Sequence, residues 1–211
     1  MKKIICAILA AVLMLSIFVS CVGKKPGGES GSSEPSSAAV TGPDTSDIER
    51  GEILGGKFYL GMTRAQLVKA LADENMKLYV DEDEEESYTS DGGYKHENGQ
   101  LSYMTDSFSF MIDNNGTLLS IMVSDPGYQS AAGLKFGDSF ESAKAIYGEG
   151  KAYKFVPGWE DPGDSYALFY SYKFGDNYLI FYVDNNHENK VESWQISKDE
   201  SWIHTVIASF N

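Results

Sequence analysis

Hydrophobic and polar positions divide the chain into an apolar leader, a polar segment and two stretches of short alternating elements. In residues 57–71 a short apolar run leads to Gly61, and a helical pattern that includes Leu67 on its apolar face follows. Thr63 and Gln66 have the spacing of a capping box. This stretch therefore predicts a short strand, a turn and an amphipathic helix.

The same pattern recurs in residues 133–148. When Gly137 is placed over Gly61, Ser139 falls over Thr63 at the expected start of the helix. Ser139, or Asp138 with Glu141, provides the N-terminal cap, and Gly148 ends the helix after Tyr147.

Alternating apolar residues predict antiparallel strands between and after the two helices. Asp113-Asn-Asn-Gly116 is typical of a hairpin turn, because Asn and Gly tolerate positive φ angles. The expected strands cover residues 57–60, 76–80, 101–112, 118–123, 151–156, 166–174, 178–183 and 191–196.

A second echo lies in the last hairpin of each stretch, where Phe110-Met-Ile-Asp-Asn-Asn115 matches Phe181-Tyr-Val-Asp-Asn-Asn186. Two echoes in the same order indicate a duplicated unit. We predict an α+β fold of two tandem repeats, each a helix plus an antiparallel β-meander, which share a sheet with the helices packed on one face. The expected boundaries are residues 51–128 for the first repeat and 129–211 for the second, which ends in a C-terminal helix.

The N-terminus predicts export. Residues 1–20 have a positive start and an apolar run, which are typical of a signal peptide. Phe18-Val-Ser-Cys21 resembles a bacterial lipobox, which implies that Cys21 becomes the first mature residue and carries the lipid; the alternatives are a plain signal peptide or a membrane anchor. Residues 21–50 contain almost no large apolar side chain after Cys21 and predict a disordered linker.

Charge and cysteine content narrow the range of partners. The formal net charge is −14, and removal of Lys2 and Lys3 with the signal makes it −16, which disfavours nucleic acid and anionic lipid head groups. Cys6 and Cys21 are the two cysteines of the chain, so the mature domain has no disulfide and depends on its core. The acyl chains on Cys21 are therefore the expected link to the membrane, with the domain on its extracytoplasmic side.

Both repeats carry a motif that resembles a known group. The signatures Leu60-Gly-Met-Thr-Arg-Ala-Gln-Leu67 and Phe136-Gly-Asp-Ser-Phe-Glu-Ser-Ala143, each followed by a hairpin with Asp-Asn-Asn, resemble the repeat of the BamE-like and β-lactamase-inhibitor-protein-like group. The resemblance covers about residues 53–197 and implies a bacterial lipoprotein that binds other proteins through its sheet without catalysis.

The sequence contains no strong catalytic or metal motif. His96, His187 and His204 are far apart, no serine lies in a known nucleophile motif, and no Gly-rich phosphate loop is present, so we predict no cofactor, no metal site and no enzyme. The acidic run Asp81–Glu86 suggests a solvated loop, with calcium binding as the alternative. A hydrolase with an Asp/Glu pair is a further alternative.

Surplus aromatic residues are the remaining signal. If Phe181 and Val183 point inward, the residues between them point outward, and an exposed tyrosine row suits a binding surface. The alternative is that a second layer, such as the C-terminal helix, covers the row. The candidate binding face comprises Trp159, Tyr170, Tyr172, Tyr178 and Tyr182.

The predicted function is a non-catalytic cell-surface lipoprotein that recruits or inhibits an envelope or extracellular protein through the exposed face of its sheet. The alternative is a glycan-binding or small-ligand-binding lipoprotein that uses Trp159 and tyrosines for stacking, with a pocket around residues 157–164.

Overall fold

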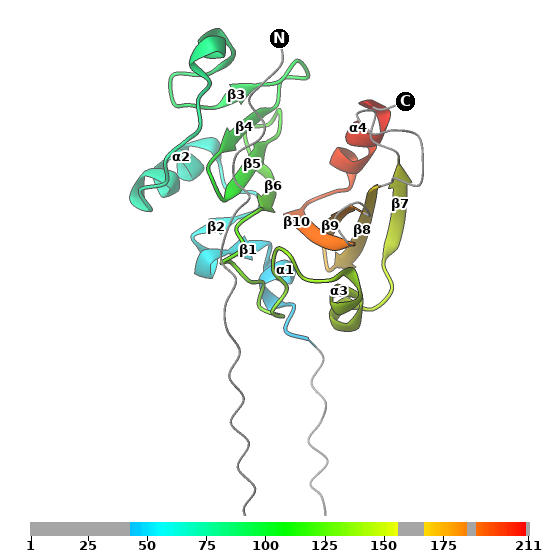
Figure 1. Cartoon of the computed structure of the whole chain (residues 1–211). Coiled ribbons are helices and arrows are strands. Elements are labelled where there is room, and N and C mark those ends of the chain that lie inside the picture. The colour runs from blue at the N-terminus through cyan, green and yellow to red at the C-terminus, as the bar shows by residue number, and fades with distance from the viewer. Residues whose placement is uncertain (1–42, 156–166, 185–188, 210–211) are drawn as a thin grey trace, which may run out of the picture. The chain divides into compact units, whose positions relative to one another are not determined.

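An antiparallel eight-stranded sheet organises the fold (Figure 1). The structure is a computed structural model that describes residues 43–155, 167–184 and 189–209, all within the compact unit Val40–Asn211. The helices are α1 Ser46–Arg50, η1 Leu54–Gly56, α2 Arg64–Asp73, η2 Glu82–Ser87, α3 Phe140–Tyr147 and α4 Ser201–Ser209. The strands are β1 Glu52–Ile53, β2 Phe58–Tyr59, β3 Tyr94–Lys95, β4 Leu101–Met104, β5 Phe108–Ile112, β6 Leu118–Val123, β7 Lys151–Phe155, β8 Ala167–Phe174, β9 Asn177–Asp184 and β10 Lys190–Ser197.

The strand order is β3-β4-β5-β6-β10-β9-β8-β7. Each half of the sheet is a four-stranded meander that follows one helix, α2 or α3, in the chain. The last strands of the two meanders, β6 and β10, pair with each other in the middle, with Trp194 opposite Val123 and Ile196 opposite Ile121. The fold is therefore α+β, as predicted.

One side of this sheet, the core face, carries the main hydrophobic core. Phe110, Ile121, Phe181 and Trp194 each have at most 1% of their surface exposed. Residues of α1, α2 and α3 pack against them, so that these three helices belong to the same cluster as the core face. Burying each large apolar side chain contributes about 1.5–3 kcal/mol, which makes this layer the main source of stability.

The opposite side, the second face, has a separate cover over β7–β9. Helix α4 packs there through Ile203, which is fully buried, against Phe169 and Ile180. Figure 1 shows α3 and α4 on opposite sides of β8–β10. The prediction that all helices pack on one face is therefore wrong. The C-terminal helix covers the second face because the tyrosine-rich strands there are apolar on both sides.

The turn at Gly61 fixes α2 to the sheet. Gly61 N donates to Leu118 O at 2.8 Å, Leu118 N donates to Met62 O at 2.8 Å, and Arg64 N donates to Gly116 O at 2.9 Å. The φ angle of Gly61 is 87°, a left-handed value that favours glycine. The helix start is thus bound to the returning strand of the hairpin.

The turn at Gly137 makes the same contacts in the second half. Gly137 N donates to Val191 O at 2.8 Å, Val191 N donates to Asp138 O at 2.9 Å, and Phe140 N donates to Asn189 O at 2.9 Å. The φ angle of Gly137 is 83°. Both helix starts therefore dock on their hairpins with the same three backbone bonds.

Each returning strand also contains one extra residue at the same place. The register between β5 and β6 shifts at Leu119, and the register between β9 and β10 shifts at Glu192. A β-bulge of this kind bends its strand and re-aims the neighbouring side chains. The two hairpins thus have the same antiparallel pairing and the same position of the β-bulge.

Both predicted helix caps form. The Thr63 side chain accepts from Gln66 N while the Gln66 side chain accepts from Thr63 N, which is the expected capping box. In α3 the Ser139 side chain accepts from Ser142 N, so Ser139 rather than Asp138 is the cap.

Two strand predictions need correction. Residues 76–80 form no strand, because their apolar side chains Tyr79 and Val80 are 56% and 40% exposed and have no sheet to cover. The expected long strand 101–112 is two strands, β4 and β5, because Thr105–Ser107 turns the chain and Thr105 Oγ1 caps that turn by accepting from Phe108 N.

A described helix precedes the predicted boundary at residue 51. Helix α1 lies in the stretch expected to be linker, and its Ile48 is fully buried. The buried Asn177 donates from Nδ2 to the carbonyl oxygens of Ile48 (3.0 Å) and Glu49 (2.8 Å), and it accepts from Lys198 Nζ at 2.8 Å. A single apolar residue and a buried amide from a distant strand thus hold a segment whose composition alone predicts disorder.

A polar network joins α2 to the segment before β3. Arg64 donates to Asp91 through Nε (3.1 Å) and NH2 (2.7 Å), and Arg64 Nε also donates to Tyr103 Oη at 2.7 Å. Thr89 Oγ1 donates to Asp91 Oδ1 at 2.5 Å. Partial burial alone would raise the pKa of Asp91, but Arg64 and Thr89 outweigh it and hold this pKa at about 2.

Replacement of Asp91 should therefore weaken folding in a pH-dependent way. Because the folded pKa lies below the unfolded value of 3.8, the carboxylate stabilises the fold above pH 4, and this contribution is lost as pH falls toward 2. The Arg64 and Asp91 side chains are 38% and 30% exposed, so solvent screening leaves about 1 kcal/mol. Urea unfolding of D91N should show this loss at pH 7 and almost none at pH 2.

The control is Asp73→Asn in the exposed Lys69–Asp73 pair of α2, which should leave stability unchanged at both pH values. An equal loss for D91N at pH 7 and pH 2 would contradict the assigned role of its charge.

Candidate functional site

The four described tyrosines of the predicted binding face lie on two different sides of the sheet. Tyr170 lies opposite Phe181 and Tyr172 lies opposite Leu179, so both belong to the core face. Tyr182 lies opposite Phe169 and Tyr178 lies opposite Lys173, which places them on the second face. Directly opposed residues of antiparallel strands share a face of the sheet. The register between β8 and β9 therefore puts Tyr170 and Tyr172 on one face and Tyr178 and Tyr182 on the other, so the four do not form one row.

The two core-face tyrosines are involved in packing. Tyr172 is 7% exposed and donates from its hydroxyl to Gly148 O at 2.8 Å. Burial raises the pKa of Tyr172 to about 12. The ring of Tyr170 lies 4.0 Å from that of Phe140, and the two rings line a cavity of about 490 Å³ beside Lys144 of α3.

The two second-face tyrosines are half-buried under or beside α4. Tyr182 contacts the Phe169 ring at 5.4 Å, and the Phe169 ring contacts Trp202 of α4 at 5.0 Å. The C-terminal helix covers the row, which is the alternative considered from the sequence. The prediction that these tyrosines form an exposed face is wrong, and Trp159 lies outside the described residues.

The second face of the first half has a different composition. Strands β4, β5 and β6 each carry the pattern Ser-x-Met in register, and their second-face residues alternate between the two types across neighbouring strands. Serine of one strand lies opposite methionine of the next, as in Ser109 opposite both Met104 and Met122. We call this surface the serine–methionine face; it comprises Ser102, Met104, Ser109, Met111, Ser120 and Met122.

No described helix packs on the serine–methionine face in the way that α4 packs on β7–β9. Its three methionines are half-buried and belong to neither hydrophobic cluster. Methionine is unbranched and polarisable, so a surface rich in it adapts to varied partner shapes. Within the described residues this is the sheet surface that best fits a binding role.

The central strands separate this surface from the region under α4. Gln195 of β10 lies between Met122 and Ile180 on the second face and is 3% exposed. Its amide nitrogen has no hydrogen-bond partner among the described residues.

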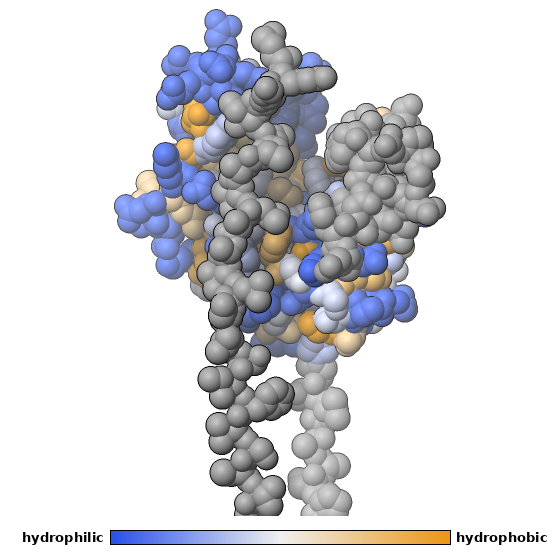
Figure 2. Space-filling model, in the orientation of Figure 1, coloured by the Kyte–Doolittle hydropathy of each residue, from blue (hydrophilic) through white to orange (hydrophobic). Residues whose placement is uncertain are grey.

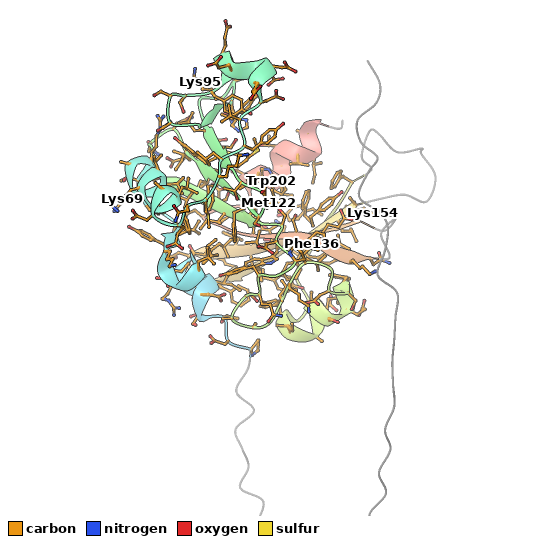
Figure 3. All side chains as sticks on the ribbon, turned by 60° about the vertical axis from the view of Figure 1, so that its left-hand side comes forward. Lys69, Lys95, Met122, Phe136, Lys154 and Trp202 are labelled. Carbon is orange, nitrogen blue, oxygen red and sulfur yellow. The ribbon has the colours of Figure 1, made fainter. Side chains whose placement is uncertain are left out.

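A cavity of about 350 Å³ lies where the serine–methionine face meets α4. Met111 and Ser120 line it from the sheet, and Trp202 lines it from α4. Figure 3 labels Trp202 and Met122, which come from α4 and β6. The turn between β3 and β4 closes another wall with His96 and its neighbours.

The titratable groups near this surface are few. His96 contacts Ser102 through Nε2 at 3.0 Å, and burial lowers the pKa of His96, so its ring is neutral at pH 7. His204 packs edge-on against the Tyr153 ring at 5.5 Å, and His187 lies outside the described residues.

The pKa shifts of the described carboxyl groups all have one direction. In the described part of the chain, those with a displaced pKa are Asp44, Asp91, Asp113 and Glu200, and all four are displaced downward. Hydrolysis by an Asp/Glu pair needs one carboxyl group whose pKa is raised. The described carboxylates instead serve turns, caps and ion pairs, such as Asp113 in the hairpin between β5 and β6.

The acidic run at residues 81–86 lies largely in η2, whose surface is hydrophilic in Figure 2. Asp81 Oδ1 accepts from Asp83 N and begins this helix. Across the described ranges, no group of three or more His, Cys, Asp or Glu side chains has the arrangement of a metal site. No described helix has the length and apolar character needed to cross a membrane.

Comparisons with known proteins give limited information. The chain matches no protein-family model, and no curated protein matches it. Among solved structures it is similar to YjgB, a DUF4309 family protein from Bacillus subtilis, with 14% identity, a TM-score of 0.44, and coverage of 72% of this chain and 90% of that chain.

Sequence reasoning did not identify the serine–methionine face. Its signal is in the sequence, since Ser102-Tyr-Met104, Ser109-Phe-Met111 and Ser120-Ile-Met122 repeat one pattern, the first two within the predicted strand 101–112 and the third within 118–123. The prediction relied on aromatic residues, which are concentrated in the second half of the chain. There the large side chains serve two packed layers rather than one exposed surface.

Proposed function

We propose that the chain is a non-catalytic, lipid-anchored binding protein that holds another envelope or extracellular protein against the serine–methionine face. The observation that carries this proposal is the contrast between the two halves of the second face. Helix α4 covers β7–β9, while the corresponding surface of β4–β6 has no helix over it in the described part of the chain.

The chemistry of this face suits a protein partner. Half-buried methionines offer apolar contact that adapts to its counterpart, and the half-buried Ser109 between them offers a hydroxyl group that can donate or accept a hydrogen bond. Ser102 and Ser120 are 4% and 7% exposed and contribute less to this surface. With a net charge of −14, the chain is not suited to bind polyanions such as nucleic acid.

The proposal includes a duplicated fold. It is supported by the three backbone bonds that Gly61 and Gly137 each organise, and by the bulges at Leu119 and Glu192. Duplication explains why one half can carry a cover, α4, that the other half lacks: only the second copy is followed by the C-terminal segment. The resemblance to BamE-like repeats stays a prediction.

Binding can be tested with a purified chain that begins after Cys21. The double variant Met111→Lys/Met122→Lys places two charges on the serine–methionine face and should lose partners that the unchanged chain retains from an envelope extract. Tyr79→Lys, at a 56% exposed position outside this face, is the matched control. Retention of the same partners by the double variant, at unchanged melting temperature, would reject the proposed surface.

Lipid anchoring through Cys21 gives a separate prediction. Cys21→Ala should move the protein from the membrane fraction to the soluble fraction and abolish incorporation of labelled palmitate, because the acyl chains supply the membrane affinity. Cys6→Ala, within the expected signal peptide, should leave both readouts unchanged. Palmitate labelling of the Cys21 variant would contradict the lipid assignment.

A further inference from the structure

The cavity between α4 and the sheet has a composition that differs from the rest of the chain. It is lined by residues of the β3–β4 turn, β5, β6, β10 and α4, and none of the described lining residues is Asp, Glu, Lys or Arg. Charged residues make up 23% of the sequence. A polar but uncharged wall in so acidic a chain selects for an uncharged occupant.

One wall includes an aromatic side chain. Trp202 is half-buried, and its ring packs edge-on against Phe169 at 5.0 Å. This contact fixes the indole in place at the first turn of α4. An indole held in this way can stack against the C–H face of a ring while its N–H stays able to donate a hydrogen bond.

The opposite wall provides amide groups. The Gln100 Oε1 atom accepts from Asn98 Nδ2 at 2.9 Å, which leaves the Gln100 amide nitrogen without an acceptor among the described residues. Asn98 Oδ1 accepts from Gln100 N at 3.1 Å, and Asn114 Nδ2 donates to Asn98 O at 3.1 Å, so the turn that carries both side chains is held in place.

Hydroxyl groups complete the lining. Ser120 and Ser197 contribute them from the sheet, and Thr205 contributes one from α4. Ser197 Oγ donates to Leu119 O at 3.4 Å and Thr205 Oγ1 donates to Ser201 O at 3.1 Å, so these two hydroxyls are left to act as acceptors beside the amide donor of Gln100. The volume of about 350 Å³ is within the usual range of small-molecule sites, about 300–1,000 Å³.

We propose that this cavity binds a neutral saccharide, with one sugar ring stacked on Trp202 and its hydroxyl groups bonded by Gln100 and the serine and threonine hydroxyls. A sugar ring has an apolar C–H face and a rim of hydroxyl groups, which matches one aromatic wall and a polar, uncharged remainder. Met111 and Leu119 add apolar contact at the edge. This inference does not rest on the proposed protein binding, although Met111 and Ser120 belong to both the cavity and the serine–methionine face.

Titration with neutral trisaccharides tests the proposal. The probes are triacetylchitotriose, cellotriose and maltotriose, and the readout is the indole N–H signal of Trp202 in ¹⁵N-labelled protein. At least one probe should shift this signal in a saturable way. The signal of Trp194, which is 1% exposed, should stay unchanged.

The fully deacetylated glucosamine trimer is the matched control ligand. It has the same rings but carries positive charge, so nonspecific attraction to an acidic protein favours it over triacetylchitotriose. A cavity that selects uncharged rings should bind triacetylchitotriose more tightly than the glucosamine trimer. Stronger binding of the cationic trimer, or no saturable shift with any of the three neutral probes at 10 mM (roughly the weak limit of specific binding), would overturn the proposal.

Two variants locate the site. Gln100→Ala removes an amide from the turn without touching α4 and should weaken binding about tenfold, which corresponds to one hydrogen bond. Trp202→Ala removes the indole reporter, so binding to this variant is followed by the backbone amide signals of Gln100 and Ser120, which should no longer shift. Gln100→Ala keeps the test valid if the Trp202 variant loosens α4. Met104→Lys on the serine–methionine face, outside the cavity, should leave sugar binding intact even where it affects a protein partner.

If both single variants, Gln100→Ala and Trp202→Ala, bind the sugar with the affinity of the unchanged chain, the sugar binds elsewhere and the assignment of this cavity is contradicted. Loss of sugar binding in Trp202→Ala with retained protein capture is the expected result, because Trp202 lines the cavity but is not part of the serine–methionine face.

Discussion

Alanine at Phe110 or at Phe181 should lower the free energy of unfolding by about 3–5 kcal/mol, the usual cost of truncating a fully buried phenylalanine. Both side chains have 0% of their surface exposed. Phe110 contacts the ring of Phe58 at 4.9 Å, and Phe181 contacts the rings of Tyr147 and Tyr172 at 5.6 and 5.3 Å.

Comparison of the Phe110 and Phe181 variants tests whether the two halves of the sheet contribute equally to stability and unfold together. Phe110 lies opposite Ile121 in the first half, and Phe181 lies opposite Trp194 in the second. Because β6 and β10 pair in the middle of the sheet, each variant should unfold in one transition with an unchanged urea m-value.

The control is Phe136→Ala, at a position that is 38% exposed, which should stay within about 0.5 kcal/mol of the unchanged chain. Two separate transitions in Phe110→Ala, or a cost below about 1 kcal/mol at one site, would contradict a shared core.

Replacement by aspartate should lower stability strongly at one position of the second face and hardly at all at the matching position of the other half. Ile180 of β9 is 1% exposed beneath α4, so Ile180→Asp buries an unpaired charge and should cost more than about 4 kcal/mol or prevent folding. Ser109 of β5 is half-buried on the serine–methionine face, and Ser109→Asp should change stability by at most about 0.5 kcal/mol.

The measurement is urea unfolding followed by circular dichroism. If Ile180→Asp does not yield folded protein, Ile180→Ala and Ser109→Ala give the same comparison, with an expected cost of about 2–5 kcal/mol at position 180 and almost none at position 109. Similar costs at the two positions would mean that the serine–methionine face is covered as tightly as the surface under α4.

Local signals predicted much of the fold. The capping box of Thr63, the serine cap of α3 and the hairpin at Asp113 depend on neighbours within a few residues, and each forms as expected. The alternation of apolar residues in the predicted strand 101–112 also agrees with the structure, where Phe108, Phe110 and Ile112 are buried on one face.

Features that depend on distant contacts were not predictable. Composition assigned Ile48 to the linker, but the amide of Asn177 holds its helix. Register likewise decides which tyrosines share a face. Tyr170 lies opposite Phe181, and the next residue of that strand, Tyr182, points to the other face of the sheet. The cavity beside Trp202 is formed by segments from five elements, so no local pattern indicates it.

Methionine oxidation measures the central claim, that the serine–methionine face is open in the isolated protein. Treatment with hydrogen peroxide, followed by mass spectrometry of fragments, gives a rate for each methionine. Met104, Met111 and Met122 should oxidise about tenfold faster than Met62, which is 3% exposed in the core. Rates for these three as slow as that of Met62 would show that another part of the chain covers the face, and would contradict the account.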